Sequence, residues 1–172
     1  NMDFELFKSI IDEGKNYLEL VCLQDVGEPL MNKNIFQMIE YCKLNDIRTL
    51  ISTNATLLDN KTAINLLDSC IDYIIFAFDG TEKDTYENIR IGANYNKVIE
   101  NIRFFLAEKI RKKTKTFCTL QCIYMDKTEK ETSEFRKMWN ISGVDAIRIR
   151  QITYGVDLNN PLQKKYSNIN YK

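Results

Sequence analysis

The feature of this sequence that most constrains its fold is a regular alternation of short apolar segments with longer segments of helical spacing. Five segments have the apolar and β-branched composition of buried strands, and they are 17–24, 49–54, 73–78, 117–125 and 145–152. Between them, apolar residues recur three and four positions apart. Strands and helices that alternate in units of roughly 25 to 45 residues are typical of right-handed βαβ units and a parallel sheet. The sequence therefore predicts the α/β class.

Several segments carry more detailed expectations. The segment 73–78 is almost wholly apolar, which predicts a strand buried on both faces. The polar stretch after it indicates a single helical turn at 84–86. A long helix is expected over 95–109, and the basic run 109–115 is interpreted as a charged connection. A basic run this short is more typical of a solvated helix end than of a nucleic-acid site.

The two ends of the chain differ from its middle. Helical spacing over 4–13 opens the sequence without a strand in front of it, so we expect an N-terminal strand to lie outside this sequence. Residues 1–155 are expected to form one domain, which is large enough to bury a core. The Asn- and Lys-rich residues 156–172 show no periodicity. They are interpreted as a tail or linker toward a missing C-terminal extension.

Composition excludes several classes of function. Lysine plus arginine equals aspartate plus glutamate at 24 each, so no net charge favours nucleic acid or an anionic membrane. No apolar run approaches the roughly 20 residues that span a bilayer, and no signal peptide is evident, so a cytoplasmic protein is expected. The five cysteines are widely spread, which argues against a disulfide framework. The absence of histidine disfavours zinc hydrolases and Ser-His triads.

Polar residues follow three of the predicted strands at the point where each strand ends. These endings are Gly-Glu-Pro at 27–29, Ser-Thr-Asn at 52–54 and Asp-Gly at 79–80. Because parallel strands place their carboxyl ends on one rim, we expect these groups to lie close together. Gly27 permits a close approach of the backbone to a ligand, and Pro29 stops the strand. The alternative for this loop is an ordinary strand-to-helix turn with a solvated glutamate.

Alternation along the later strands predicts a second set of polar groups. Thr119 and Gln121 share one face of their strand, and Arg148 and Arg150 share one face of the last strand. Two arginines on one side of an apolar strand are costly unless they are paired or face a polar cavity. A partly open barrel would supply such a cavity. The alternative is that both arginines lie on the exposed face of an edge strand.

Together these motifs resemble the radical S-adenosylmethionine (SAM) superfamily, and most closely its peptide- and protein-modifying members with a cysteine-rich SPASM-type extension. The segment 27–30 resembles the end of that family's Gly-Gly-Glu-Pro motif, and 52–58 is similar to its Thr-Asn-Gly-Thr-Leu-Leu segment. The segment 76–80 resembles its Ser-x-Asp-Gly strand end. Residues 86–90, followed by 98–102, are similar to the next family segment. The resemblance runs from about residue 4 to residue 152.

Three positions depart from the family's pattern. Val26 replaces the first glycine, Ala55 stands at a glycine position, and Ala77 stands at the serine position. The resemblance nevertheless implies a fold, namely an α/β partial (β/α)6 TIM-like barrel of parallel strands with its N-terminal strand missing. It also implies a set of residues that bind SAM, and these are Gly27, Glu28, Pro29, Thr53, Asn54, Asp79, Arg90, Gln121 and Arg150.

The resemblance assigns a part of the cofactor to some of these residues. The backbone around Gly27 and Glu28 would hold the methionine amino group, and Asn54 with Thr53 would line the pocket. Asp79 would meet the ribose region. The resemblance also implies roles in cofactor binding for Arg90, Gln121 and Arg150. Arg90 would face the cofactor carboxylate, since a guanidinium suits a carboxylate, while Gln121 and Arg150 would line the pocket floor.

One family element is absent from the sequence. The Cys-x-x-x-Cys-x-x-Cys loop, which binds a 4Fe–4S cluster, does not occur. Cys118 and Cys122 have only the first spacing, and in a strand they point to one face, so they are interpreted as small apolar fillers. The cluster is therefore expected in a complete protein, with ligands outside this chain, and the chain is expected to be a piece of a larger protein.

The resemblance implies the barrel fragment of a radical SAM iron–sulfur enzyme. Such an enzyme cleaves SAM to a 5′-deoxyadenosyl radical, which abstracts hydrogen from a peptide, protein or small-molecule substrate, and it needs an electron donor. The catalytic residue is not identified, and neither nucleic acid nor membrane is an expected partner. One alternative is a degenerate, non-catalytic barrel that binds a partner. Another is a different α/β enzyme with a phosphorylated ligand, but no glycine-rich phosphate loop is present.

Overall fold

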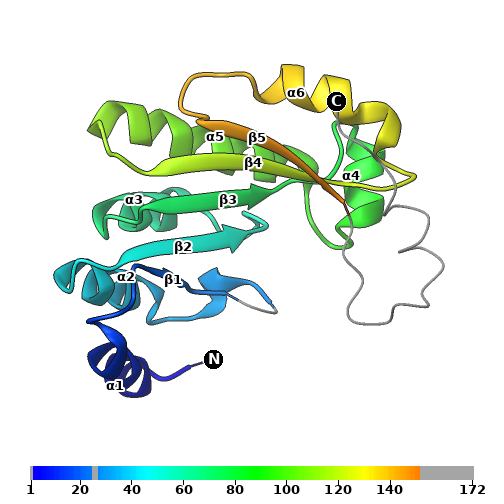
Figure 1. Ribbon diagram of the computed structural model, residues 1–172. Helices are drawn as coiled ribbons and strands as arrows, with labels where there is room; N and C mark the ends of the chain where they lie inside the picture. The colour runs from blue at the N-terminus through cyan, green and yellow to red at the C-terminus, as the bar shows by residue number, and fades with distance from the viewer. Residues whose placement is uncertain (1, 25–26, 152–172) are drawn as a thin grey trace, which may run out of the picture.

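The computed structural model describes residues 2–24 and 27–151 of the chain. This part is built on one sheet of five parallel strands that follow one another in chain order, as Figure 1 shows. The strands are β1 (Leu20–Cys22), β2 (Arg48–Thr53), β3 (Tyr73–Ala77), β4 (Phe117–Tyr124) and β5 (Ala146–Gln151). Each strand pairs in parallel with the next one, with registers such as Thr53 beside Phe76 and Ala77 beside Gln121. The predicted α/β class is confirmed.

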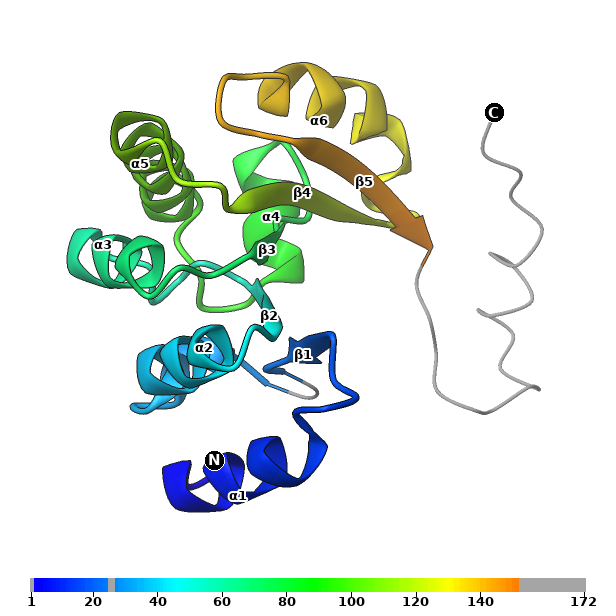
Figure 2. The ribbon, with the colours of Figure 1, turned by 60° about the vertical axis from the view of Figure 1, so that its left-hand side comes forward.

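In the described part of the chain, six helices connect and flank these strands. They are α1 (Phe4–Gly14), α2 (Ile35–Leu44), α3 (Asn60–Asp68), α4 (Lys83–Ile89), α5 (Tyr95–Lys112) and α6 (Thr132–Trp139). Two short 3-10 turns, η1 (Pro29–Met31) and η2 (Glu129–Glu131), precede α2 and α6. All helices except α4 cover one side of the curved sheet, whereas α4 lies beyond the carboxyl end of β3 (Figures 1 and 2). Sequential parallel strands with helices on one side form the wall of a partial barrel.

Local sequence signals place the starts of three helices. Asp3, Asp59 and Asn94 each accept a hydrogen bond from a backbone N–H in the first turn of the helix that follows. Such N-cap bonds satisfy donors that the helix itself cannot satisfy. The end of α5 is also specified locally, because Lys113 adopts a left-handed φ of 53° there.

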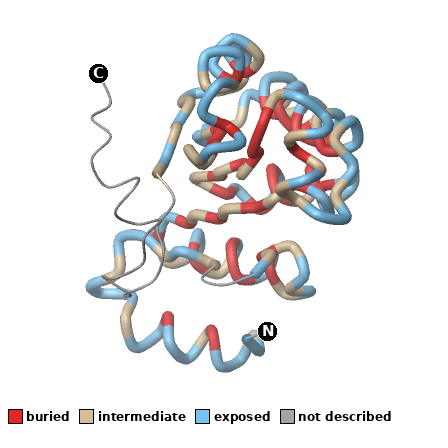
Figure 3. Tube along the Cα trace, turned by 90° about the vertical axis from the view of Figure 1, so that its right-hand side faces the viewer, coloured by how far each residue is buried: buried red, intermediate tan, exposed pale blue. Residues whose placement is uncertain are grey.

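The core lies between the sheet and its outer helices. Residues on the helix-facing side of the strands are fully buried, among them Ile51, Ile74, Phe76 and Leu120. Figure 3 shows buried positions along the strands and on the inner sides of the helices. A smaller cluster joins α1 to α2. Each large apolar side chain that is fully buried contributes roughly 1.5 to 3 kcal/mol relative to exposure.

Several sequence-based details are corrected by the structure. The strand predicted over 17–24 is only β1, because residue 17 belongs to the turn after α1, where its N–H bonds to the carbonyl of Gly14. The segment 73–78 is not buried on both faces, since Tyr73, Ile75 and Ala77 on the concave side are only half-buried. The single turn expected at 84–86 is the longer helix α4.

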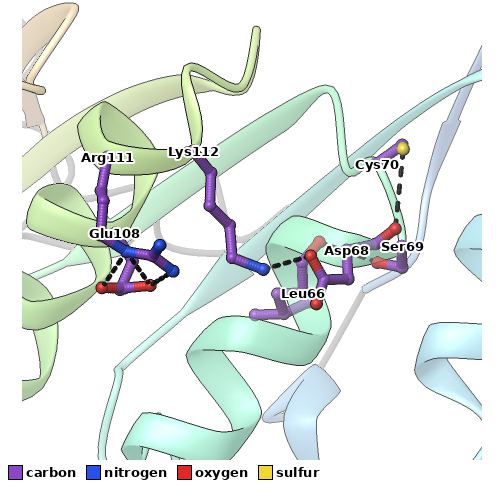
Figure 4. Close-up of polar contacts among 7 residues, drawn as sticks. All are labelled: Leu66, Asp68, Ser69, Cys70, Glu108, Arg111 and Lys112. Atoms are coloured by element: carbon purple, nitrogen blue, oxygen red, sulfur yellow. Dashed lines mark hydrogen bonds and ion pairs between the residues drawn. The ribbon is translucent and has the colours of Figure 1, made fainter.

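The basic segment 109–115 was interpreted as a charged connection, but the structure places more than half of it in a helix. Residues 109–112 form the last turn of α5, and three of the basic side chains are paired. Figure 4 shows Arg111 bound to Glu108 and Lys112 bound to Asp68 at the end of α3. Lys109 is buried and pairs with Asp145. These acidic partners neutralise three of the five positive charges of the segment.

Two expectations concern parts that lie outside the described residues. The tail predicted over 156–172 falls there, as does the end of the domain predicted over 1–155. Among the helices that the structure describes, none is both long enough and apolar enough to cross a membrane.

Candidate functional site

The carboxyl ends of the parallel strands lie along one edge of the sheet (Figure 1). The register brings Ala77 of β3 beside Gln121 of β4, and Ile123 of β4 beside Arg150 of β5. The loops that follow β1, β2 and β3 start from the same edge. The polar groups predicted at the strand ends therefore share one rim, as the parallel arrangement requires.

Glu28 ties the loop after β1 to the end of β2. Its Oε1 accepts hydrogen bonds from the hydroxyl of Thr53 at 2.6 Å and from the N–H of Leu30 at 3.2 Å. Its Oε2 accepts from the N–H of Asn54 at 2.9 Å. A carboxylate with three such donors is firmly held. The carboxylate of Glu28 is thus used within the protein, and its backbone carbonyl also accepts from the N–H of Met31 at 3.2 Å.

The turn after β2 is held from a second direction as well. Ala55 adopts a left-handed φ of 58°, which costs roughly 1 to 2 kcal/mol for a residue with a Cβ. Asn101 of α5 donates from its Nδ2 to the carbonyl of Ala55 at 2.9 Å. The side chain of Asn54 accepts from the N–H of Thr56. The conformation at Ala55 explains why glycine suits this position.

Asp79 and Arg90 form a partly buried ion pair beyond β3. The side chain of Asp79 is 2% exposed and that of Arg90 is 29% exposed. Arg90 donates from Nε and Nη2 to one oxygen of Asp79, at 2.9 and 2.6 Å. The other oxygen accepts from the N–H of Ile123 on β4 at 2.7 Å. Both oxygens of Asp79 are therefore engaged, and this carboxylate orients the guanidinium.

Gly80 makes this arrangement possible. Its φ is +106°, and a Cβ there would lie 3.0 Å from the side chain of Thr85 and 3.2 Å from the backbone nitrogen of Tyr86. Any other residue would crowd the start of α4, and its backbone would be strained in a conformation that only glycine readily adopts. The glycine thus lets the chain turn directly from the buried Asp79 into α4.

The remaining predicted residues lie on the concave face of the sheet. Gln121 is 8% exposed, and its Oε1 is buried without a hydrogen-bond partner in the described part of the chain. Arg148 is its register neighbour on β5, and Arg150 follows on the same face. Both arginines are exposed, and neither forms an ion pair with another described residue. Their roles in cofactor binding stay predictions.

Space for a ligand borders the first loop of the rim. A groove of about 680 Å³ runs between α1 and β1 and reaches Gly27, Glu28 and Pro29. Gly27 itself has a φ of +112°, and a Cβ added there would meet no atom within 4 Å. Pro29 is buried at the start of η1. Backbone groups of this loop are therefore accessible from the groove.

The cysteines do not fit an iron–sulfur cluster. The described residues contain no group of three or more His, Cys, Asp or Glu side chains that could hold a metal ion. Cys118 and Cys122 are buried in the main core. Burial raises the pKa of Cys118 to about 12 and that of Cys122 to about 11, so neither forms a thiolate readily. The interpretation of both as apolar fillers is confirmed.

Sequence reasoning missed one member of the rim. Glu131, at the end of η2, accepts hydrogen bonds from Thr81, Glu82 and Thr85. These three residues lie 46 to 50 positions before Glu131 in the chain. No local motif marks this glutamate, so only the packing of the two loops reveals it.

Comparison with known proteins identifies relatives of this arrangement. A family model described as the radical SAM superfamily matches residues 1–136. Fe-coproporphyrin III synthase of Methanosarcina barkeri is 31% identical over 83 residues, which are 48% of this chain and 21% of that protein. The tungsten-containing aldehyde ferredoxin oxidoreductase cofactor-modifying protein of Pyrococcus furiosus is 28% identical over 81 residues, or 46% of this chain and 23% of that protein.

Solved structures share the fold at lower identity. SuiB of Streptococcus suis bound to S-adenosylmethionine matches 89% of this chain and 34% of its own, with a TM-score of 0.71 and 15% identity. The structure of anSMEcpe with bound AdoMet and the Cp18Cys peptide matches 87% of this chain and 43% of its own, with a TM-score of 0.66 and 19% identity. At such identities the likeness concerns the fold.

Proposed function

This chain belongs to the radical SAM superfamily, and we propose that its carboxyl rim is the SAM-binding wall of an enzyme of that superfamily. Members of the superfamily use SAM and a 4Fe–4S cluster. The chain spans between 21% and 30% of the length of the curated relatives that it matches. The activity assigned to the complete protein is therefore part of the proposal.

The observation that carries the proposal is the oriented guanidinium of Arg90. Asp79 engages Nε and Nη2 of Arg90, and within the described residues the guanidinium donates no other hydrogen bond. A guanidinium with free donors suits a carboxylate, and SAM carries one carboxylate on its methionine part. Asp79 then supports the cofactor through Arg90 rather than by its own contact with the ribose.

The other rim residues supply complementary groups. The accessible backbone of Gly27 and Glu28 would receive the methionine amino group, beside the turn formed by Thr53 and Asn54. Pro29 would fix the end of this loop. In addition, Gln121 would offer its unpartnered amide oxygen from the concave face, and Arg150 would line the same face. The chain's own groups thus bind and orient the cofactor.

SAM and a reduced cluster together supply a 5′-deoxyadenosyl radical for hydrogen abstraction. The described residues offer no ligand set for the cluster, so its ligands would come from elsewhere in the complete protein. A peptide or protein substrate and a SPASM-type extension are proposed by analogy with SuiB bound to precursor peptide and anSMEcpe bound to a peptide. This analogy rests on the fold. An electron donor would be a further partner.

Anaerobic reconstitution of the complete protein tests the proposal. The protein is loaded with iron and sulfide, reduced with dithionite and mixed with SAM, and 5′-deoxyadenosine is measured by mass spectrometry. We expect formation of 5′-deoxyadenosine, reduced by about tenfold or more in Arg90→Gln because a charged contact to the cofactor is lost. Glu134→Gln, an exposed control on α6, should retain the activity. A cluster-loaded protein that forms no 5′-deoxyadenosine would contradict the proposal and favour a non-catalytic binding barrel.

A further inference from the structure

The carboxylate of Glu131 gathers donors from the loop after β3 and from the first turn of α4. One oxygen accepts from the N–H of Thr81, from its hydroxyl at 3.0 Å and from the N–H of Glu82 at 3.2 Å. The other oxygen accepts from the hydroxyl of Thr85 at 2.5 Å. No other carboxylate described above receives as many hydrogen bonds. Such a concentration of donors on one charged group indicates a defined position for the loop.

The loop after β3 and the loop after β4 each contribute a carboxylate that accepts hydrogen bonds from the other segment. Asp79, from the loop after β3, accepts from the N–H of Ile123 at the end of β4. Glu131, from the loop after β4, accepts from the start of α4. Between these contacts, Thr128 is fully buried and donates its hydroxyl to the carbonyl of Ile123 at 2.6 Å. The two loops are therefore bound to each other in both directions.

The contact with Glu131 lies at the start of α4. This helix has seven residues, and its own N-cap residue, Glu82, makes no capping hydrogen bond through its side chain. Helices this short are not stable by themselves. Glu131 instead accepts from the N–H groups of Thr81 and Glu82, directly before the helix, and from the hydroxyl of Thr85 in its first turn. Arg90 is the C-cap residue of α4, so its place follows from the place of this helix.

We propose that Glu131 is a positioning residue, which holds the start of α4 and thereby fixes the guanidinium of Arg90. Tyr86 anchors the middle of α4, where its ring stacks on Phe78 with centroids 4.6 Å apart. Asp79 holds the guanidinium itself. These two contacts hold the middle and the end of α4, and Glu131 restrains its start. The consequence for the cofactor rests on the function proposed above for Arg90.

The first test measures Arg90 without the cofactor. In the complete protein with isotope-labelled arginine, the NMR signal of the Arg90 Nε–H is assigned by its loss in Arg90→Lys. We expect Glu131→Gln to accelerate hydrogen exchange of this group by about tenfold or more, while the core amides of β3 keep their protection. Glu134→Gln, which removes an exposed carboxylate of α6, the helix that follows Glu131, should change neither. Unchanged exchange of the Arg90 signal in Glu131→Gln would overturn the proposal.

A second variant keeps the test decisive if Glu131→Gln does not fold. Thr85→Val removes one donor and preserves the shape of the side chain. It should accelerate the same exchange in the same direction, by a smaller factor. An effect that is equal at Arg90 and throughout the core would show a global loss of stability and overturn the proposal.

The third test measures SAM affinity of the cluster-loaded complete protein in a double-mutant cycle. We expect Glu131→Gln to weaken binding about tenfold when Arg90 is present, and to have no further effect in an Arg90→Gln background. Equal weakening in both backgrounds would overturn the link through Arg90. If Arg90 exchange responds but affinity does not, the positioning role stands and the cofactor role proposed for Arg90 falls.

Discussion

One carboxylate oxygen of Asp79 receives both Nε and Nη2 of Arg90, while its second oxygen receives the N–H of Ile123. A single buried carboxylate therefore joins the end of α4 to the end of β4. Removing one partner of a buried ion pair leaves the other without compensation, which is more costly than losing a surface pair. The pair thus determines both the local stability of the rim and the direction of the guanidinium.

The first prediction concerns Asp79→Asn. The amide keeps an acceptor for Ile123 but loses the charge that balances Arg90. We expect the free energy of unfolding to fall by roughly 3 kcal/mol, at the low end for buried pairs because Arg90 is partly exposed. Urea unfolding measures this loss. Asp68→Asn removes an exposed pair with Lys112 and should cost less than about 1 kcal/mol. Equal losses in both variants would contradict the role given to Asp79.

The second prediction concerns the tie between the first two strands. Glu28→Gln replaces an acceptor oxygen with an amide group that faces the donors of Thr53 and Asn54. We expect a loss of roughly 1 to 3 kcal/mol and faster hydrogen exchange at the turn after β2. Thr53→Val should give a smaller loss. Exchange at this turn that stays at the wild-type rate would show that Glu28 does not hold it.

The third prediction concerns the cysteines. Cys22 and Cys70 are exposed, whereas Cys42, Cys118 and Cys122 are buried. Burial raises the pKa of each of these three thiols to about 11 or about 12. We expect iodoacetamide to modify the two exposed cysteines of the folded protein first, and the buried three only on unfolding. Mass spectrometry of the native protein checks this. Early modification of Cys118 would contradict its placement in the core.

The fourth prediction concerns pH. Partial burial would raise the pKa of Glu131, but hydrogen bonds from Thr85, Thr81 and Glu82 outweigh it, so the pKa is lowered from 4.5. A carboxyl whose pKa is lower in the folded state contributes stability above its unfolded pKa and loses it as pH falls through the folded value.

The wild type should therefore exceed Glu131→Gln in stability by a constant amount at neutral pH. This difference should shrink as the pH falls below about 4.5. Unfolding curves of both proteins across this range measure it. A difference that grows on acidification would contradict the lowered pKa of Glu131.

Much of the fold follows from local pattern. Apolar segments such as 73–78 and 117–125 predicted the strands, and the order of strands and helices predicted their parallel arrangement. Polar residues at strand ends then had to share one rim, so Glu28 and Asp79 could be placed on that rim from their positions in the sequence. The local sequence was sufficient here because a parallel sheet leaves few alternative positions for residues at the ends of its strands.

The partners of these groups could not be predicted in the same way. The hydrogen bonds of Glu28 with Thr53 and of Glu131 with Thr85 join residues far apart in sequence. The sequence around a glutamate in a polar loop does not indicate which donors it will bind. The length of α4 was missed for the same reason. Its start is stabilised by Glu131 from another loop, and not by a capping residue of its own.

The proposed function requires SAM to bind at the carboxyl rim of this sheet. A crystal structure of the complete, cluster-loaded protein with SAM shows where the cofactor lies. We expect the cofactor carboxylate within hydrogen-bond distance of Arg90, and the amino group beside the backbone of Gly27 and Glu28. Electron density for SAM on the helix-covered side or at the amino edge of the sheet would contradict the account.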